Sequence, residues 1–227
     1  MSLKLSIIIP TLNAAGGLPG TLDALLPGVA AGIIKEVIVS DGGSNDATCK
    51  LADDAGAEVI TGPAGRGAQL RRGAAAARGE WLLFLHADTH LPADWVGAVA
   101  SHAQTHETAA AFRLSFRATG IPPGFTAWFA NTRTRLFSLP YGDQGLLISR
   151  GLYDAVGGYP DQPLMEDVAI AKALRGRLIM LDETVSTSAA RYQRDGWMRR
   201  GIANLWMLAR YRLGVSPERL AKTYQKS

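Results

Sequence analysis

The chain has 227 residues, of which 47% are apolar and 19% charged, with a formal net charge of +4. This composition is typical of a folded soluble protein with one large domain or two small ones. Its single cysteine, Cys49, excludes an internal disulfide, and no stretch approaches the ~18 apolar residues of a transmembrane helix. The amino terminus runs into a strand pattern without a secretory leader, so we expect a cytoplasmic protein.

The first ninety residues alternate between strand and helix patterns. Short runs rich in Ile, Val and Leu are typical of strands that are covered on both faces, and the segments between them have helical character. This order predicts an α/β fold with a mostly parallel, right-handed, doubly wound sheet. The expected strands are 5–10, 36–40, 57–60 and 81–85, and the expected helices are 16–31, loosened by its prolines, 46–55 and 66–78.

The second half of the chain is more mixed. We find no repeat, low-complexity segment or linker, and therefore favour one domain over residues 1–190 followed by a helical extension, 191–227, packed on it. Within that domain a nucleotide-binding half would cover about 1–90 and an acceptor half about 91–190. The expected strands here are 109–116, 144–149 and 178–181, and the expected helices are 125–137, 165–175 and 196–213.

Asp41 lies where the second strand ends, in the segment Asp41-Gly-Gly-Ser-Asn-Asp46. In an open α/β sheet the carboxyl ends of parallel strands form the ligand crevice, and glycines allow the backbone to approach a ligand closely. A carboxylate here can accept hydrogen bonds from a nucleotide base or from ribose hydroxyls. The alternative is that Asp41 only caps the next helix, and this segment alone does not decide between the two.

Asp88 follows another buried strand, in the segment His86-Ala-Asp88. An oxygen ligand in this position suits a hard divalent ion such as Mg²⁺ or Mn²⁺, which would bridge the two phosphates of a nucleotide. His86 is either a further ligand or, as is commoner for a lone histidine, a hydrogen-bonded structural residue. The two strand-end carboxylates thus suggest a nucleotide and a metal.

The adjacent acids Glu166 and Asp167 begin a predicted helix, where the helix dipole alone can explain them. Their functional interpretation is a general base that removes a proton from an attacking hydroxyl, with the second acid binding the acceptor. Arg66 follows a Gly-Pro-Ala-Gly segment and would meet phosphate or base there, although a solvated surface arginine is the commoner case.

In this order, the segments resemble the family 2 glycosyltransferases of the GT-A fold. The resemblance begins at Ser6-Ile-Ile-Ile-Pro-Thr-Leu-Asn13 and ends near Glu166-Asp167, covering about three quarters of the chain. A narrower similarity is to a bacterial branch of selenodomain-associated or arsenosugar-biosynthesis transferases, whose name fixes no substrate. It rests on the segments 65–69, 84–89, 141–145, 157–160, 164–168 and 186–192.

The resemblance implies a role for each matching residue. Asp167 would be the catalytic base and Glu166 its acceptor-side neighbour, while Asp88 would hold Mg²⁺ or Mn²⁺ as the last acid of the family's D-x-D motif. The segment Gly142, Asp143 and Gln144 would form part of the floor near the donor sugar or the acceptor. The nucleotide-binding set would be Thr11, Asn13, Asp41, Gly42, Arg66 and Ala87.

Departures from the family pattern bear on the reaction. His86 replaces the first acid of D-x-D, which puts metal binding in doubt, and Ala14 stands where many members carry Glu. The Q-x-x-R-W motif of processive polymerases is absent, since Gly196 takes its Arg position, so a single transfer is favoured. We expect an inverting, metal-assisted transfer of a sugar from a nucleotide-diphosphate sugar to a hydroxyl acceptor. The alternatives are a nucleotidyltransferase and a non-catalytic nucleotide-sugar binding module.

The segment 196–213 near the carboxyl end forms an amphipathic helix whose apolar side is flanked by arginines, and nine basic residues against two acidic ones follow position 190. Such a helix can lie in a membrane interface, which would place the protein at the inner face of the membrane. Packing on the sheet or on a second subunit, in a homodimer, is the favoured alternative. The charge favours an anionic partner, for which we do not expect a nucleic acid.

Overall fold

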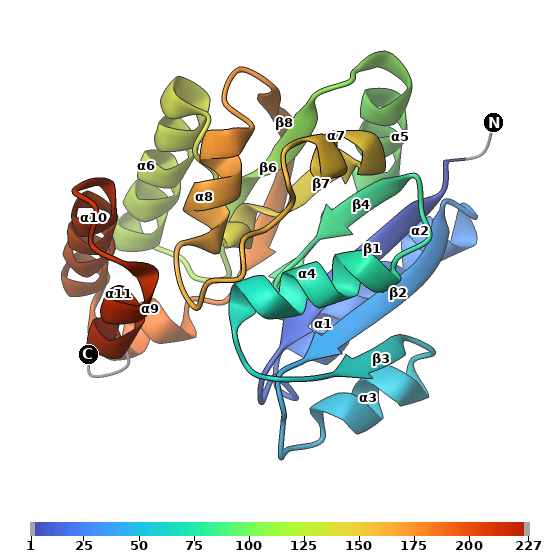
Figure 1. The fold of residues 1–227 in the computed structure, drawn as a ribbon, viewed down its shortest axis with the longest axis horizontal. Helices are drawn as coiled ribbons and strands as arrows, with labels where there is room; N and C mark the ends of the chain where they lie inside the picture. The colour runs from blue at the N-terminus through green and yellow to red at the C-terminus, as the bar shows by residue number, and fades with distance from the viewer. Residues whose placement is uncertain (1–2, 225–227) are drawn as a thin grey trace.

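The computed structural model describes residues 3–224, which form one mixed eight-stranded sheet with the strand order β3-β2-β1-β4-β7-β6-β8-β5 (Figure 1). The first four strands of this order are parallel, as predicted from the alternating pattern. They are β1 (Leu5–Thr11), β2 (Ile34–Asp41), β3 (Glu58–Thr61) and β4 (Trp81–Phe84), connected by α1 (Leu18–Asp23), α2 (Leu26–Ala30), α3 (Thr48–Asp54) and α4 (Arg66–Ala76).

The other half of the sheet mixes directions. β7 runs antiparallel to both β4 and β6, β8 runs parallel to β6, and β5 pairs antiparallel with β8. The fold is therefore a mostly parallel mixed sheet, as expected. The elements are β5 (Thr89–His90), α5 (Trp95–Thr105), β6 (Ala109–Phe116), α6 (Ile121–Phe137), the 3₁₀ helix η1 (Gly142–Gln144), β7 (Leu146–Ser149), α7 (Arg150–Ala155), α8 (Glu166–Ala173) and β8 (Leu178–Thr187).

Alternate residues of the central strands point to opposite faces, and each face is covered by its own helices. On one face Ile7 and Leu83 join a cluster with Trp95 of α5. On the other face Ile8 and Leu82 join a cluster that includes residues of α4, α7 and α8. Because both sides of β1 and β4 are buried, these strands are mostly apolar, although β1 includes the buried polar residue Ser6.

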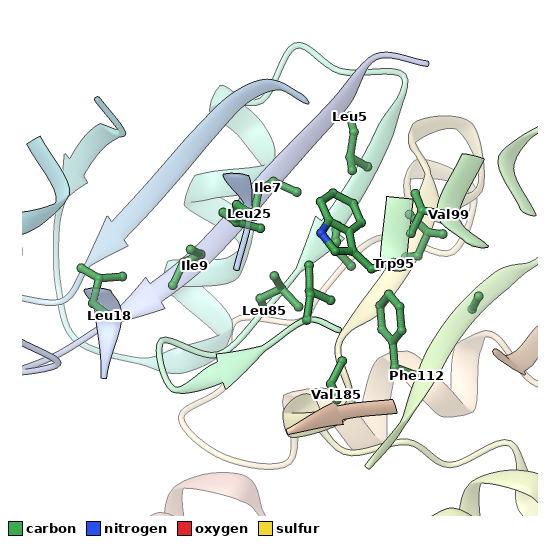
Figure 2. Close-up of a cluster of buried hydrophobic side chains, with 14 of the residues drawn as sticks. Leu5, Ile7, Ile9, Leu18, Leu25, Leu85, Trp95, Val99, Phe112 and Val185 are labelled. Carbon is green, nitrogen blue, oxygen red and sulfur yellow. The ribbon is translucent and has the colours of Figure 1, made fainter. Parts of the chain in front are cut away.

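Trp95 is the largest side chain that is fully buried. Figure 2 shows its indole among apolar side chains from the sheet and the helices, and its Nε1 donates to the carbonyl of Ala24 over 3.1 Å. A Cβ on Gly28 of α2 would collide with this ring, so the glycine permits the close packing of α2. The helix that carries Trp95 was not among the predicted elements.

The chain ends in three helices at the α6 side of the molecule (Figure 1). They are α9 (Ala190–Asp195), α10 (Trp197–Arg212) and α11 (Pro217–Tyr224). Trp197 stacks on Tyr192 and meets Phe116 edge-on, while Leu208 of α10 packs in a small cluster with Leu139 and Val168. Residues 225–227 of the expected extension lie outside the described residues. Over the described part of the chain, no helix combines the length and apolarity needed to cross a bilayer.

Candidate active site at the carboxyl edge of the sheet

The candidate residues from the first half of the chain gather at one edge of the sheet. β1, β2 and β4 are parallel neighbours, and the segments holding Thr11, Asp41 and Asp88 come at or just after their carboxyl ends. Since the carboxyl ends of parallel strands meet at the same edge, the sequence positions translate into one ligand-facing region.

Asp41 organises the loop that follows β2. It is 1% exposed, its Oδ1 accepts from the hydroxyls of Thr11 and Ser44, and its Oδ2 accepts from the backbone N–H groups of Gly43 and Ser44. Burial raises the pKa of Asp41, but these hydrogen bonds outweigh it and keep the pKa below its usual value. Four accepted hydrogen bonds fill the lone-pair sites of a carboxylate, so Asp41 stabilises the backbone of the loop after β2.

The loops after β1 and β2 are tied together by further hydrogen bonds. Asn13, which has a left-handed backbone (φ 50), accepts from the N–H of Asn45 through Oδ1 and donates its own N–H to Ser44 Oγ. Gly42 donates its N–H to the carbonyl of Thr11. The nucleotide-binding residues expected on both loops thus belong to one hydrogen-bonded unit.

Gln69 of α4 also hydrogen-bonds to the backbone of this unit. Its Nε2 donates to the carbonyls of Thr11 and Ser40 over 2.6 and 3.0 Å, and its Oε1 accepts from the N–H of Gly65. The side chain is buried, and Gly42 lies so close to it that an added Cβ would meet it at 3.1 Å. The segment Gly65-Arg-Gly-Ala-Gln69 is one of those that carry the resemblance to the narrower bacterial branch. Gln69 itself was not predicted as a site residue.

Arg66, at the start of α4, reaches the acidic pair of the second half. Its Nε lies 3.6 Å from Oε1 of Glu166. A Cβ on the next residue, Gly67, would collide with backbone atoms of Pro160 and Gln162, so the glycine lets α4 approach the loop before α8. The structure therefore brings Arg66 and Glu166, a hundred residues apart in sequence, into one site.

Glu166 and Asp167 are adjacent but have different environments. Met165, which precedes them, takes a left-handed backbone (φ 65) and turns the chain into α8. Glu166 is 1% exposed, and burial together with the neighbouring Asp167 raises its pKa to about 7, against the opposing effect of Arg66. Asp167 is only partly buried. Of the two acids, Asp167 is thus the one that solvent and a substrate can reach.

Asp167 is held by backbone donors while keeping lone pairs free. Its Oδ2 accepts from the N–H of Gly142 over 3.1 Å, and its Oδ1 accepts from the N–H of Val168 over 2.7 Å. A Cβ on Gly142 would collide with the imidazole of His86, so His86 packs directly over this glycine. His86, Gly142, Glu166 and Asp167 also line a small cavity with room for about one water molecule.

A further acidic group, Asp143, interacts with this region. Burial raises the pKa of Asp143 to about 6, with Asp167 and Asp88 adding to the effect and Arg133 opposing it. Oδ1 of Asp143 is buried and has no hydrogen-bond partner among the described residues. Such an oxygen is left for a ligand hydroxyl or cation to satisfy.

Gln144, expected near the sugar, is instead fully buried. Its Oε1 accepts from Arg133 Nη2 and from the Thr134 hydroxyl, and its Nε2 donates to the carbonyl of Phe112. Arg133 also lies over the ring of Tyr141, 3.4 Å from its centroid. Gln144 and Arg133 therefore fix η1 to α6. The structural roles of Arg133 and Gln69 were not predicted, because nothing in the local sequence indicates them.

Asp88 is a carboxylate, the type of oxygen ligand that a divalent cation takes. The Cα and Cβ of Asp88 pack close to Gly17 at the start of α1, and Asp88 acts on the pKa of Asp143. No group of three or more His, Cys, Asp or Glu side chains within residues 3–224 forms a complete metal cage. A Mg²⁺-type site with one or two carboxylates, completed by phosphates and water, needs no such cage.

Burial lowers the pKa of His86 well below its usual value, and Arg66 and Arg191 lower it further. His86 is therefore a neutral imidazole between two arginine charges. Arg191 of α9 lies in the segment 186–192 of the narrower resemblance and in the basic tail, but was not predicted as a site residue. Its effect on the pKa of His86 shows that its positive charge acts on the site, a relation that only the tertiary structure reveals.

Comparison with known proteins connects this geometry to a family. The model of the family described as "Glycosyl transferase family 2" matches residues 6–144. A PGL/p-HBAD biosynthesis glycosyltransferase of Mycobacterium bovis (strain BCG / Pasteur 1173P2) is 34% identical over 164 residues, which are 68% of this chain and 62% of that protein. The chain thus spans less than two thirds of the length of the curated relatives that it matches.

Solved structures share the fold at lower identity. A mannosyltransferase from Pyrobaculum calidifontis, in complex with GDP-Man and Mn²⁺, is 19% identical with a TM-score of 0.68 over 96% of this chain and 67% of that one. S. aureus TarS in complex with UDP-GlcNAc is 17% identical with a TM-score of 0.63 over 82% and 58%. The fold is of the GT-A type expected from the sequence. The family match, together with the identity to the mycobacterial relative, shows that the chain belongs to glycosyl transferase family 2.

Proposed function

We propose that this protein transfers a sugar from a nucleotide-diphosphate sugar to a hydroxyl acceptor, with inversion at the anomeric carbon. The observation that carries the proposal is the placement of Asp167. It is a partly exposed carboxylate, fixed by Gly142 and Val168, and both Asp167 and Asp88 act on the pKa of Asp143.

Asp167 acts as the general base. It removes the proton from the acceptor hydroxyl as that oxygen attacks the anomeric carbon, from the face opposite the departing diphosphate. Its two backbone hydrogen bonds orient the carboxylate and leave each oxygen one lone pair for the proton. Glu166, expected on the acceptor side, is buried and lies against Arg66.

Asp88 would hold Mg²⁺ or Mn²⁺ together with the donor's phosphates. The bound ion would neutralise the negative charge that develops on the departing diphosphate. Arg66 and Arg191 add positive potential in the same region, as their common effect on His86 indicates. The P. calidifontis enzyme, solved with GDP-Man and Mn²⁺, supports a divalent ion and a nucleotide-sugar donor in this fold.

The nucleotide would lie against the two hydrogen-bonded loops that follow β1 and β2. It would contact residues of the set Thr11, Asn13, Asp41, Gly42, Arg66 and Ala87. Direct binding of base or ribose by Asp41 stays a prediction, since its oxygens are engaged by Thr11, Gly43 and Ser44. Asp143, through its unpartnered oxygen, suits a hydroxyl of the donor sugar or acceptor.

A donor-hydrolysis experiment tests the proposal without a known acceptor. The purified chain is incubated with Mn²⁺ and a panel of UDP-, GDP-, CDP- and dTDP-sugars, and nucleoside diphosphate release is measured, with water as the acceptor. We expect release from at least one donor and its loss in Asp167→Asn. Donor binding without release, in the presence of a range of alcohols, indicates a binding module; release of pyrophosphate from a nucleoside triphosphate and a sugar phosphate indicates a nucleotidyltransferase.

We further propose a cytoplasmic location for this reaction. Peripheral contact with the inner face of the membrane through 196–213 is compatible with the exposed apolar and basic side chains of α10. A homodimer stays the alternative use of the same helix.

A further inference from the structure

α6 turns an apolar face to solvent. Its inner side is anchored to the sheet, where Asn131 bonds both the N–H and the carbonyl of Leu114. The outward residues recur at helical spacing, so they form one face of the helix. The exposed large apolar residues of this face are Ile121, Phe125, Trp128, Phe129, Leu136 and Phe137.

α10 presents a second apolar face and packs against α6 (Figure 1). The fold divides the apolar stripe expected for 196–213. Trp197 and Leu208 pack against the domain, and Met207 is also buried, while other large apolar residues face solvent. Packing on the domain therefore accounts for only part of the stripe. The exposed apolar residues of α10 and its end are Met198, Ile202, Leu205, Trp206 and Leu213. Together with the outward residues of α6, we call them the α6–α10 face.

The charged side chains of the two helices themselves have one sign. Residues 108–142 and 196–213, which contain both helices, include no aspartate or glutamate. Arg135, Arg199 and Arg212 are exposed, and Arg210 is partly exposed. Two helices that carry apolar side chains and arginines, and no acid of their own, complement an apolar layer covered by negative headgroups.

We propose that the α6–α10 face docks on the surface of an anionic lipid membrane, with both helices lying in the plane of the interface. Aromatic side chains such as Trp128 and Trp206 are favoured at the headgroup level, and arginines pair with lipid phosphates. A second copy of the chain fits less well. It would bring the same arginines together with no acid on either helix to pair with them.

Hydrogen bonds connect α6 of this surface to the candidate site. Arg133 and Thr134, on the inner side of α6, hold Gln144 of η1, and η1 contains the Gly142 that binds Asp167. Docking would therefore bring the site close to the bilayer surface. The interaction goes beyond sugar transfer and can be measured without any donor or acceptor.

Vesicle sedimentation of the full chain tests the docking. We expect the protein to pellet with vesicles of phosphatidylcholine mixed with phosphatidylglycerol at low salt, to bind pure phosphatidylcholine more weakly, and to be released as salt screens the charges. Arg135→Gln and Arg199→Gln should each lower the partition coefficient by about fivefold, because a basic residue near an anionic surface contributes about 1 kcal/mol. Arg71→Gln, the same change on α4, is the matched control and should leave binding unchanged.

The apolar residues need their own test. The double variant Trp128→Ser with Trp206→Ser should lose most binding, whereas Leu26→Ser, on α2 and 60% exposed, should not. These side chains are exposed, so folding should persist, which circular dichroism verifies.

Tryptophan fluorescence then tests the orientation. Among the five tryptophans, Trp128 and Trp206 are 60% and 62% exposed, while Trp81 and Trp95 are buried and Trp197 is packed on Tyr192. Vesicle binding should shift emission to shorter wavelength. Replacing Trp128 and Trp206 by Phe should abolish the shift while binding persists.

Three outcomes would overturn the proposal. They are no pelleting with anionic vesicles at low salt, pelleting that the arginine and tryptophan variants leave intact, and a stable dimer in solution that Trp128→Ser with Trp206→Ser dissociates. The last would assign the face to a second copy of the chain.

Discussion

The backbone N–H of Gly142 donates to Oδ2 of Asp167 over 3.1 Å, joining the 3₁₀ turn before β7 to the first turn of α8. His86, from the end of β4, packs over the same glycine. One peptide group therefore brings together segments that were predicted separately as metal site, sugar floor and catalytic base. The relation makes the position of Asp167 depend on η1.

Asp167→Asn should lower turnover by ~10²–10⁴-fold, the usual contribution of a general base, with little change in donor affinity. The amide oxygen can still accept from Gly142, but the amide nitrogen would face the Val168 N–H, so a small loss of thermal stability is expected. Nucleotide-release rates and calorimetric donor affinity measure the two effects. Asp161→Asn, an exposed loop carboxylate, is the control. Near wild-type turnover on a genuine acceptor would move the base elsewhere.

Gly142→Ala should lower turnover because the new methyl group collides with His86 and must displace either the imidazole or η1. A displacement of 1 Å at a catalytic group can cost about 10²-fold. The matched control is Gly97→Ala in α5, where the added Cβ meets nothing within 4 Å. It should leave turnover unchanged and stabilise the helix by up to ~1 kcal/mol. Equal kinetic effects of the two substitutions would contradict this account.

Asp88→Asn should abolish the metal-dependent part of nucleoside diphosphate binding, since a neutral amide cannot match a carboxylate for a hard cation. Calorimetry with and without Mn²⁺ measures this part directly. Asp94→Asn, an exposed residue before α5, controls for the loss of one negative charge. Unchanged affinity and a retained response to Mn²⁺ in Asp88→Asn would remove Asp88 from the metal site.

The parallel half of the fold could be predicted because the local sequence of each strand indicates its structure. Strands buried on both faces are mostly apolar, and β1 and β4 follow this pattern. Pairing partners are not encoded in that way, so the antiparallel insertion of β7 between β4 and β6 could not be foreseen. The predicted strand 178–181 also proved too short, because β8 continues through the polar residues Asp182 and Glu183 to Thr187.

The site shows the same division. The positions of Asp41 and Asp88 at strand ends predicted that they face a ligand region. No local pattern reveals that the oxygens of Asp41 would instead accept hydrogen bonds from Thr11, Gly43 and Ser44. Neither does the pair Glu166-Asp167 reveal which acid is buried. That difference comes from long-range packing around Arg66, as does the burial of Gln144 against Arg133.

Gln69→Met should destabilise the protein by about 1–3 kcal/mol, because it removes the hydrogen bonds that the buried Gln69 amide makes with the carbonyls of Thr11 and Ser40 and with the N–H of Gly65. The loops after β1 and β2 would also lose their common support, so donor affinity should fall. Urea unfolding measures the first effect and calorimetry the second. Gln104→Met, exposed on α5, makes the same chemical change where no such bonds exist among the described residues. Equal stability of both variants would show that Gln69 holds nothing.

Glu166 should make stability depend on pH. Its pKa is raised from 4.5 to about 7 in the folded protein, chiefly by burial and then by Asp167. The folded state therefore keeps a proton that the unfolded chain releases near pH 4.5. The stability that comes from this group is complete below pH 4.5 and is lost as the pH rises through about 7.

Glu166→Gln should remove this loss, because an amide of the same shape does not titrate. Asp143 and His86 also titrate with shifted pKa values, so the informative quantity is the difference between wild type and variant. The free energy of unfolding of each should be measured from pH 4.5 to 8, with exposed Glu107→Gln as the control. We expect the variant to gain stability relative to wild type across that range, whereas Glu107→Gln should track wild type. A constant difference between Glu166→Gln and wild type at every pH would mean that Glu166 is ionised in the folded protein throughout, and that Arg66 rather than burial controls its charge.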